Sequence, residues 1–496
     1  MVIYQSEDQS SISAANIPDV IVYDNSNIQK VCSGVTTPLT FHFTKRIYAS
    51  IYRQTVKTLS LSDKVILKNE DIFQNLVGLI KGRIYYNLNS WYRGLHLFQS
   101  LNDTQVGLKQ MMGLSDPLNF QDEELTWKKK FLFLGAKCVD FPLLLINFMS
   151  LKSKTVKFLA KMQHCCSDFY LKDFSKMSIQ ELKNEKGKLD NEVLHLWTTP
   201  VVNDLYIWIT CGDIVNKLRK AGLKNPEEFV NKFLTEEESV ASMLPARQLH
   251  RLAIEASYQP DLKHLINRIP QDIHQQVKTR FHDFHLKVML FIDKYGDKTT
   301  GELKLETQTM RSEPFVFYNY LRDCLRAQIS EIRATSQTQE FAKKALEKHI
   351  ADLPASQSEK IMAKIAVLNK ALINRELFKL ERSRVFGMYR TLYTAFGSRF
   401  EKSKWIEKAS DIFYLTEEEI LSGGNGKEFV FDTLIATRKQ EYKSYETESS
   451  PTRIFVSNKF NDLVKEKGVS KVAPIHGFDP SGAQTEVAFP CSFASI

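Results

Sequence analysis

The sequence predicts a mainly α-helical fold: a large helical body, with room for two lobes, and a few short strands near the termini. Apolar residues recur with the helical period of about 3.6 residues from residue 38 to about residue 440. Glycine makes up only 20 of the 496 residues, below its usual share of about 7%. Strand-like runs are few and short. Helices are therefore expected to build most of the core.

The clearest amphipathic helix is expected to begin at Pro38. Its apolar residues share one face because they recur every fourth position: Leu39, Phe43, Ile47 and Ile51. Thr37 supplies a hydroxyl of the kind that caps helix N-termini, and proline is favoured at the first helical position. A second helix is expected from Asp272 to Asp293, ending at Tyr295 and Gly296.

The longest helix is expected to start near Ser358 and to run through Leu392. Its early apolar stripe consists of Ile361, Ile365, Leu368 and Leu372. Gly387 and Gly397 are candidate break points, because glycine disfavours a helix interior. The segment is therefore either one rod or several shorter helices.

Short strands are expected near both ends, at Val20–Tyr23 and at Arg453–Ser457. The polar residues 441–453 read as a linker, and the Ser- and Gln-rich residues 1–16 as a disordered tail. The predicted organisation is thus a disordered tail (1–16), a helical domain (17–440) and a C-terminal segment (441–496) that begins as a linker.

Composition and cysteine usage exclude several classes of protein. Hydrophobic residues make up 43% and charged residues 25%, which is typical of a globular protein and not of a disordered or collagen-like chain. A chain of 496 residues can bury a core without the help of disulfides. Its 7 cysteines form no CxxC pair, which indicates reduced thiols and a cytoplasmic location.

The net charge and the hydropathy of the chain argue against nucleic-acid and membrane partners. We interpret the net charge of +9 as a solvated basic surface, because nucleic-acid-binding proteins usually concentrate their charge in a patch. The most apolar stretch, Phe131–Met149, is interrupted by Lys137, Asp140 and Pro142, whereas a membrane-spanning helix needs about 20 mostly apolar residues. We expect a buried helix there, broken near Pro142, and neither a nucleic-acid nor a membrane partner.

Common catalytic and metal-binding motifs are missing from the sequence. Walker A, GxGxxG and HExxH patterns do not occur. His282 and His285 lie one helical turn apart, and His164 precedes Cys165 and Cys166. The histidine pair has no third ligand nearby, and adjacent residues rarely converge on one ion. We therefore expect no metal site.

Four segments carry a recognisable order along the chain. The first is Asn25–Ile28 with Ser33–Thr40, and the second is Gly82–Asn87 with Trp91 and Tyr92. The third is Tyr295–Lys298 with Gly301–Leu303 and Glu313, and the fourth is Arg375–Arg382 with Asp411–Thr416. Together they resemble the central region of the phosphoenolpyruvate synthase and rifampin phosphotransferase family over residues 20 to about 455. Asp297 stands where that family usually has histidine, and Met310 stands near a usual tryptophan.

This resemblance implies a central, substrate-binding module. In that family an ATP-grasp domain phosphorylates a histidine on a swivelling domain, which delivers the phosphate to an acceptor. Residues 1–16 are too few for an ATP-grasp domain, and none of the 11 histidines follows a threonine as in the family's phosphohistidine motif. By resemblance, residues 441–496 are a linker and the truncated start of the mobile domain. ATP and Mg²⁺ are then expected on a partner domain or subunit, and no cofactor on this chain.

The matched segments contain a candidate anion site. On a helix, Arg375, Lys379 and Arg382 share one face, where they could bind a phosphorylated histidine or an anionic acceptor. The alternative is local pairing, because Glu376 and Glu381 each lie three residues before a basic residue.

A second candidate wall comes from the segment near residue 87. Arg83, Asn87 and Trp91 step by four, with Tyr86 beside them, which on a helix gives a mixed polar and aromatic face suited to a pocket. The alternative is plain core packing. Glu302 is a candidate general base, or else a residue that caps or bridges a neighbouring helix.

We predict that the Arg375–Arg382 and Arg83–Trp91 segments line one cavity that holds a small-molecule phosphate acceptor. The favoured function is a substrate-binding part of an ATP-dependent, dikinase-type phosphotransferase that is inactive alone. Its ATP-grasp and phosphohistidine partners are then supplied in trans. The main alternative is a non-catalytic helical binding or scaffold protein derived from the same family.

Overall fold

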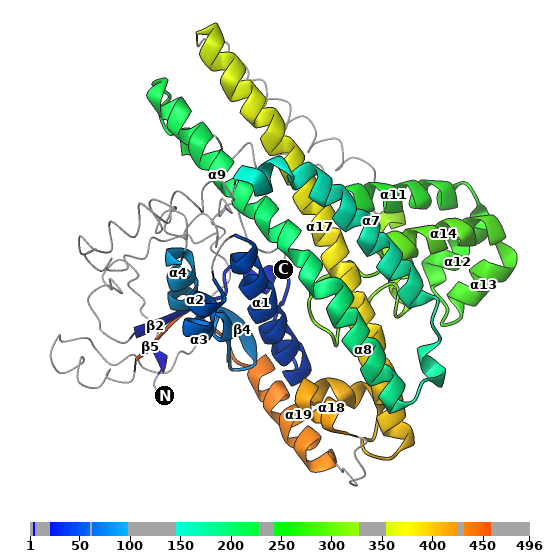
Figure 1. Cartoon of the computed structure of the whole chain (residues 1–496). Coiled ribbons are helices and arrows are strands. Elements are labelled where there is room, and N and C mark those ends of the chain that lie inside the picture. The colour runs from blue at the N-terminus through cyan, green and yellow to red at the C-terminus, as the bar shows by residue number, and fades with distance from the viewer. Residues whose placement is uncertain are drawn as a thin grey trace. The chain divides into compact units, whose positions relative to one another are not determined.

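The computed structural model describes residues 3–4, 20–59, 62–97, 145–227, 230, 243–326, 354–423 and 431–457. Helices predominate among these residues and accompany a small sheet, which confirms the predicted mainly α-helical fold (Figure 1). The chain divides into two compact units. Unit 1 draws on Met1–Lys154, Leu194–Val202 and Phe413–Ala494, and unit 2 on Thr155–Val193 and Asn203–Ile412. Each unit thus combines segments that are far apart in the sequence.

Unit 1 combines the sheet with helices. Its described elements are β1 (Ile3–Tyr4), β2 (Val20–Asp24), the 3-10 helix η2 (Ile28–Lys30), α1 (Pro38–Thr58), α2 (Asp63–Lys68), α3 (Glu70–Gln74), β3 (Val77–Ile80), β4 (Arg83–Asn87), α4 (Leu88–His96), η4 (Leu194–Trp197), α18 (Glu417–Ser422), α19 (Asp432–Glu446) and β5 (Arg453–Ser457). The first residues of α9 (Thr198–Lys220) also belong to this unit.

The sheet is antiparallel with the strand order β1-β5-β2-β4-β3. The two predicted strands are confirmed as β2 and β5, which pair along their lengths with Val22 opposite Phe455. β3 and β4 were not expected from the sequence. They form a hairpin whose two-residue turn, Lys81-Gly82, has positive φ at both positions, as tight hairpin turns of this kind require.

Both predicted terminal segments contain ordered structure. Ile3 and Tyr4, the described part of the predicted disordered tail, pair with β5. The predicted linker from residue 441 begins inside α19, which continues to Glu446. Tyr442 holds this helix in unit 1, because its hydroxyl donates to the carbonyl of Val35 at 3.1 Å. Residues after 457 lie outside the described part of the chain.

Helix α1 begins at Pro38 as expected. Its predicted apolar stripe is buried: Leu39, Phe43, Ile47 and Ile51. Thr37 occupies the N-cap position, but its side chain makes no capping hydrogen bond. Instead, the backbone N–H and the hydroxyl of Thr36 both donate to the carbonyl of Gly82, at 2.8 and 3.0 Å. The segment before α1 is thereby tied to the β3–β4 turn.

Unit 2 is helical in its described part. Its elements are most of α7 (Leu151–Tyr170), η3 (Phe174–Lys176), α8 (Ile179–Val193), the rest of α9, α11 (Leu244–Ser257), α12 (Pro260–Arg268), α13 (Ile273–Arg280), α14 (His282–Tyr295), α15 (Pro314–Arg326), α17 (Ala355–Lys402) and most of η5 (Ala409–Tyr414). α11 to α15 share an apolar core that includes Ile273, Phe284, Val288 and Phe317.

The predicted helix from Asp272 to Asp293 is two helices. α13 ends at Arg280 and α14 begins at His282, because Phe281 leaves the helical conformation with φ −134° and ψ 57°. The Phe281 ring packs against the apolar core of α11 to α15. A side chain drawn into the core thus interrupts a pattern that reads as continuous in the sequence.

Helix α17 is one unbroken helix of 48 residues and the longest described element of unit 2 (Figure 1). Neither candidate break point interrupts it. A Cβ on Gly387 would lie 2.1 Å from the carboxylate of Asp297, and one on Gly397 would lie 2.1 Å from the carbonyl oxygen of Ala409. Both glycines therefore allow other segments to approach the helix closely.

Most of the apolar stretch Phe131–Met149 lies outside the described residues. Among the helices that are described, none combines the length and the apolar character needed to cross a membrane.

Candidate functional site

The basic stripe of α17 consists of Arg375, Lys379 and Arg382, which share one helix face as predicted. Arg375 is 1% exposed and Arg382 is 2% exposed. Every residue from Glu381 to Arg390 is buried, so the part of the helix that begins at the end of the stripe and includes Arg382 is covered on all sides. Arginine is seldom buried this deeply unless it is paired, so the surroundings of the stripe decide what it can do.

The local ion pairs expected as the alternative do form. Lys379 Nζ lies 2.8 Å from Glu376 Oε1, and Arg384 Nη1 lies 3.1 Å from Glu381 Oε1. Arg382 instead pairs with a residue distant in sequence. Its Nη2 donates to Glu302 Oε1 at 2.8 Å. Glu376 on α17 and Glu302 from a loop thus neutralise part of the stripe, whereas the Glu381–Arg384 pair lies outside it.

Glu302 is buried and held at both carboxylate oxygens. Oε1 accepts from Arg382, and Oε2 accepts from the Ser383 hydroxyl at 2.8 Å. Burial by itself raises the pKa of Glu302, but Arg382, Lys298 and the Ser383 hydrogen bond outweigh it, so the net pKa is lowered. A carboxylate with a lowered pKa is a weak proton acceptor. This geometry favours a positioning role for Glu302, and its catalytic role stays a prediction.

Arg390 fastens the loop that carries Glu302 to α17. Its Nη2 donates to the carbonyl of Lys304 at 2.8 Å, and its Nε donates to the carbonyl of Leu305 at 3.2 Å. The loop is therefore held by its backbone as well as by the Glu302 carboxylate.

Arg382 keeps hydrogen-bonding capacity that the described residues do not use. Its Nε and Nη1 atoms are buried and have no hydrogen-bond partner within this part of the chain. Burial lowers the pKa of the neighbouring Lys379, and the positive charges of Arg375 and Arg382 lower it further. Buried donors without acceptors and repulsion among cations are both relieved by a bound anion.

Asp297, which stands where the resembled family has histidine, is 2% exposed and pairs with Arg311 Nε at 2.7 Å. Burial raises its pKa, although Arg311 opposes the shift. Gly387 leaves room for this carboxylate against α17. Met310, near the family's usual tryptophan, is buried in the core of α11 to α15. Both departures from the family pattern thus have structural roles.

The second predicted wall is not a helix face. Arg83 begins strand β4, Asn87 ends it, and Trp91 lies in α4. The chain changes from strand to helix at Asn87, whose side-chain oxygen accepts from the backbone N–H of Ser90 at 3.2 Å and caps α4. The expectation that residues 83, 87 and 91 share a helical face is therefore wrong.

The side chains of this segment are engaged within unit 1. Arg83 Nη2 donates to the carbonyl of Glu448 at 2.8 Å, and the Trp91 indole N–H donates to the carbonyl of Leu76 at 3.0 Å. The Tyr86 ring lies edge-on to Trp91, with centroids 5.6 Å apart. These contacts match the alternative of core packing. Because the segment belongs to unit 1 and the basic stripe to unit 2, a cavity shared by them stays a prediction.

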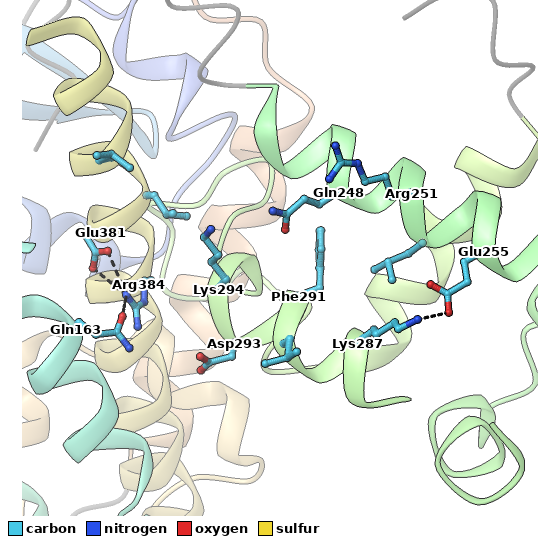
Figure 2. Close-up of a pocket in the computed structure, with 14 residues that line it drawn as sticks. Gln163, Gln248, Arg251, Glu255, Lys287, Phe291, Asp293, Lys294, Glu381 and Arg384 are labelled. Carbon is cyan, nitrogen blue, oxygen red and sulfur yellow. Dashed lines mark hydrogen bonds and ion pairs between the residues drawn. The ribbon is translucent and has the colours of Figure 1, made fainter. Parts of the chain in front are cut away.

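A pocket that the sequence did not predict lies in unit 2 (Figure 2). It has a volume of about 630 Å³, within the range of small-molecule sites. Its walls come from α7, α11, α14 and α17: Gln163, Gln248, Arg251, Leu252, Glu255, Lys287, Leu290, Phe291, Asp293, Lys294, Leu377, Leu380, Glu381 and Arg384. Because four segments that are distant in sequence form the pocket, no local sequence pattern predicts it.

The pocket and the basic stripe lie on opposite faces of α17. Each residue advances about 100° around a helix, which places Leu377, Leu380 and Arg384 about half a turn away from the stripe. The two features are therefore separate candidate sites within one unit.

The histidines of α14 do not face one another. His285 is buried beside His274 of α13, with ring centroids 4.9 Å apart, whereas His282 is exposed. In the described ranges no group of three or more histidine, cysteine or acidic side chains could hold a metal ion.

No family model matches the chain, and no curated protein is significantly similar to it. The resemblance to the phosphoenolpyruvate synthase family thus rests on the four sequence segments.

Proposed function

We propose that this chain is the substrate-binding helical module of a phosphoenolpyruvate synthase-like phosphotransferase. It binds a phosphate acceptor and docks a phosphohistidine domain, and it transfers no phosphate by itself. ATP and Mg²⁺ belong to a partner domain or subunit, and the complex works in the cytoplasm.

The observation that carries this proposal is the state of Arg382. This guanidinium is buried, and one of its nitrogens donates to Glu302. Its other two nitrogens are buried and have no acceptor among the described residues. A phosphate group offers several oxygens and binds guanidinium through paired hydrogen bonds. An anion at this point would also offset the repulsion that lowers the pKa of Lys379. The basic stripe thus has the chemistry of a phosphate receptor.

Glu302 and Arg390 have supporting roles in this proposal. Glu302 orients the Arg382 guanidinium through one N–H, and Arg390 holds the loop that carries Glu302. A receptor that is already ordered binds its ligand with a smaller loss of conformational entropy.

Titration calorimetry with phosphoenolpyruvate and with inorganic phosphate tests the proposal. Replacing Arg382 alone would leave Glu302 as an unpaired buried charge. The informative variant is therefore Arg382→Met combined with Glu302→Gln, which removes both charges. Lys370→Met is the matched control, because Lys370 is an exposed cation on the same helix.

We expect saturable binding of at least one of these anions to the wild type and to Lys370→Met. The double variant should bind about tenfold more weakly or worse, as expected for lost hydrogen bonds to a charged group. If the folded wild type binds neither anion, or if Lys370→Met loses as much affinity, the proposal fails and the non-catalytic scaffold becomes the better interpretation.

A further inference from the structure

The pocket of unit 2 has an uneven distribution of charge. Two of its three acids are paired with cations that also line it: Glu255 with Lys287 at 2.5 Å, and Glu381 with Arg384 at 3.1 Å. The third, Asp293, lies 3.5 Å from Arg311, which is outside the lining. Every acid on the pocket wall thus has a basic partner.

Two cations of the lining are left over. Arg251 of α11 and Lys294 of α14 form no ion pair with any residue in the described part of the chain. Figure 2 shows both side chains among the lining residues, with Gln248 drawn between them. Two unpaired cations beside a neutral hydrogen-bond donor form a suitable receptor for one anionic group.

The body of the pocket is apolar. Phe291 and Leu252 are buried, at 5% and 9% exposure, and form its inner surface. Leu290 and Leu377 are 72% and 36% exposed and lie at its edge. Large apolar side chains left open to solvent around a concave site mark a surface that a ligand can cover.

From these observations we propose that the pocket binds a small amphipathic carboxylate. The carboxylate lies between Arg251 and Lys294, where it also accepts from Gln248. The hydrocarbon body covers Phe291 and the exposed leucines. This site is distinct from the basic stripe, which lies on the opposite face of α17, so the two proposals stand or fall separately.

The probe is octanoate, compared with octylammonium and octanol, which keep the hydrocarbon chain and change its head group. Acetate keeps the carboxylate and removes the chain. Calorimetry on the full chain measures all four. The site predicts saturable binding of octanoate, weaker binding of octanol, and no binding of octylammonium or acetate at the same concentrations.

Two pairs of variants locate the site. Arg251→Glu should weaken octanoate binding about tenfold or more, whereas Arg247→Glu, one turn earlier on α11 and also exposed, should not. Leu290→Asn should weaken binding, whereas Leu286→Asn, an exposed leucine of α14 outside the pocket, should not. All four side chains are exposed, so the variants are expected to fold.

Octanoate binding that is absent, that octylammonium matches, or that the control variants weaken as much as the test variants would overturn the proposal. Loss of octanoate binding with unchanged phosphate binding would remove this site and leave the basic stripe intact.

Discussion

The basic stripe of α17 and the Arg83–Trp91 segment look alike in the sequence and differ in the structure. Both place cationic and polar side chains at intervals of about four residues. In α17 the spacing is that of a real helix. Arg382 is buried there, and its Nε and Nη1 have no hydrogen-bond partner among the described residues. In the other segment a strand meets a helix, and Arg83 and Trp91 donate to backbone carbonyls. In the basic stripe, buried donors without a described partner occur beside a second cation, Lys379, and this combination distinguishes the candidate receptor from the Arg83–Trp91 segment.

The largest change in stability is expected on replacing Trp91, which tests whether the Arg83–Trp91 segment is part of the core. Its ring is 3% exposed and lies edge-on to Tyr52 at a centroid distance of 4.7 Å. Trp91→Ala should lower the free energy of unfolding of unit 1 by about 3–5 kcal/mol, as for other large core aromatics. Denaturant unfolding followed by circular dichroism measures it. If the variant melts at close to the wild-type temperature, Trp91 is not a core residue, and its predicted role in a pocket wall is favoured again.

The Arg382–Glu302 pair should show a different pattern. Arg382→Met alone should cost about 3 kcal/mol or more, because it leaves the Glu302 carboxylate buried without its ion-pair partner. Adding Glu302→Gln should recover much of that loss. Two single variants and the double variant, unfolded in urea, form a complete cycle. Additive losses would show that the two side chains are not coupled and would contradict the geometry.

Two glycine-to-alanine variants in unit 2 should differ in stability, because only one of the two glycines is in close contact with another segment. Gly387→Ala should destabilise by about 1–3 kcal/mol, because its methyl group would collide with the buried Asp297 carboxylate. Gly187→Ala in α8 has open space and should stabilise by about 0.5–1 kcal/mol through helix propensity. Thermal unfolding of both variants tests this. A stabilised Gly387→Ala would show that Asp297 is not against α17.

A smaller effect is expected from pH. Burial lowers the pKa of His285, and the nearby charges of His274 and Lys278 lower it further. The unfolded chain then takes up the proton more readily than the folded one. The associated stability is complete above the ordinary histidine pKa of about 6.5 and is lost as the pH falls below it.

Stability measured in urea at neutral and mildly acidic pH checks this expectation. His285→Phe should lessen the loss on acidification, whereas His264→Gln, at an exposed position of α12, should leave it unchanged. Equal behaviour of the two variants would remove His285 as the responsible group.

The sequence predicted the features that depend on local pattern. The fold class, β2, β5, the start of α1 and the local ion pair Glu376–Lys379 follow from periodicity and spacing, and the structure confirms them. Gly387 illustrates the limit. A glycine at this position predicts a break in the helix, but the structure shows that glycine is required there because the distant Asp297 lies against it.

The candidate sites could be predicted only in part, for the same reason. The basic stripe was found because its three cations lie on one helix. The pairing of Arg382 with Glu302 spans 80 residues, and the pocket beside Phe291 joins four segments, so neither has a local signature. At Arg83 the spacing misled, since the Lys81-Gly82 turn and strand β4 precede the helix.

The most direct test of the central claim, that the basic stripe binds anions, is the pKa of Lys379. A proton NMR titration of the isotope-labelled lysine side chains, assigned with Lys379→Arg, should find this pKa below that of an ordinary lysine in the free protein, because of burial and of the charges of Arg375 and Arg382. Saturating phosphate should raise it, since a bound anion favours the charged amine. A Lys379 pKa that phosphate leaves unchanged would contradict the account.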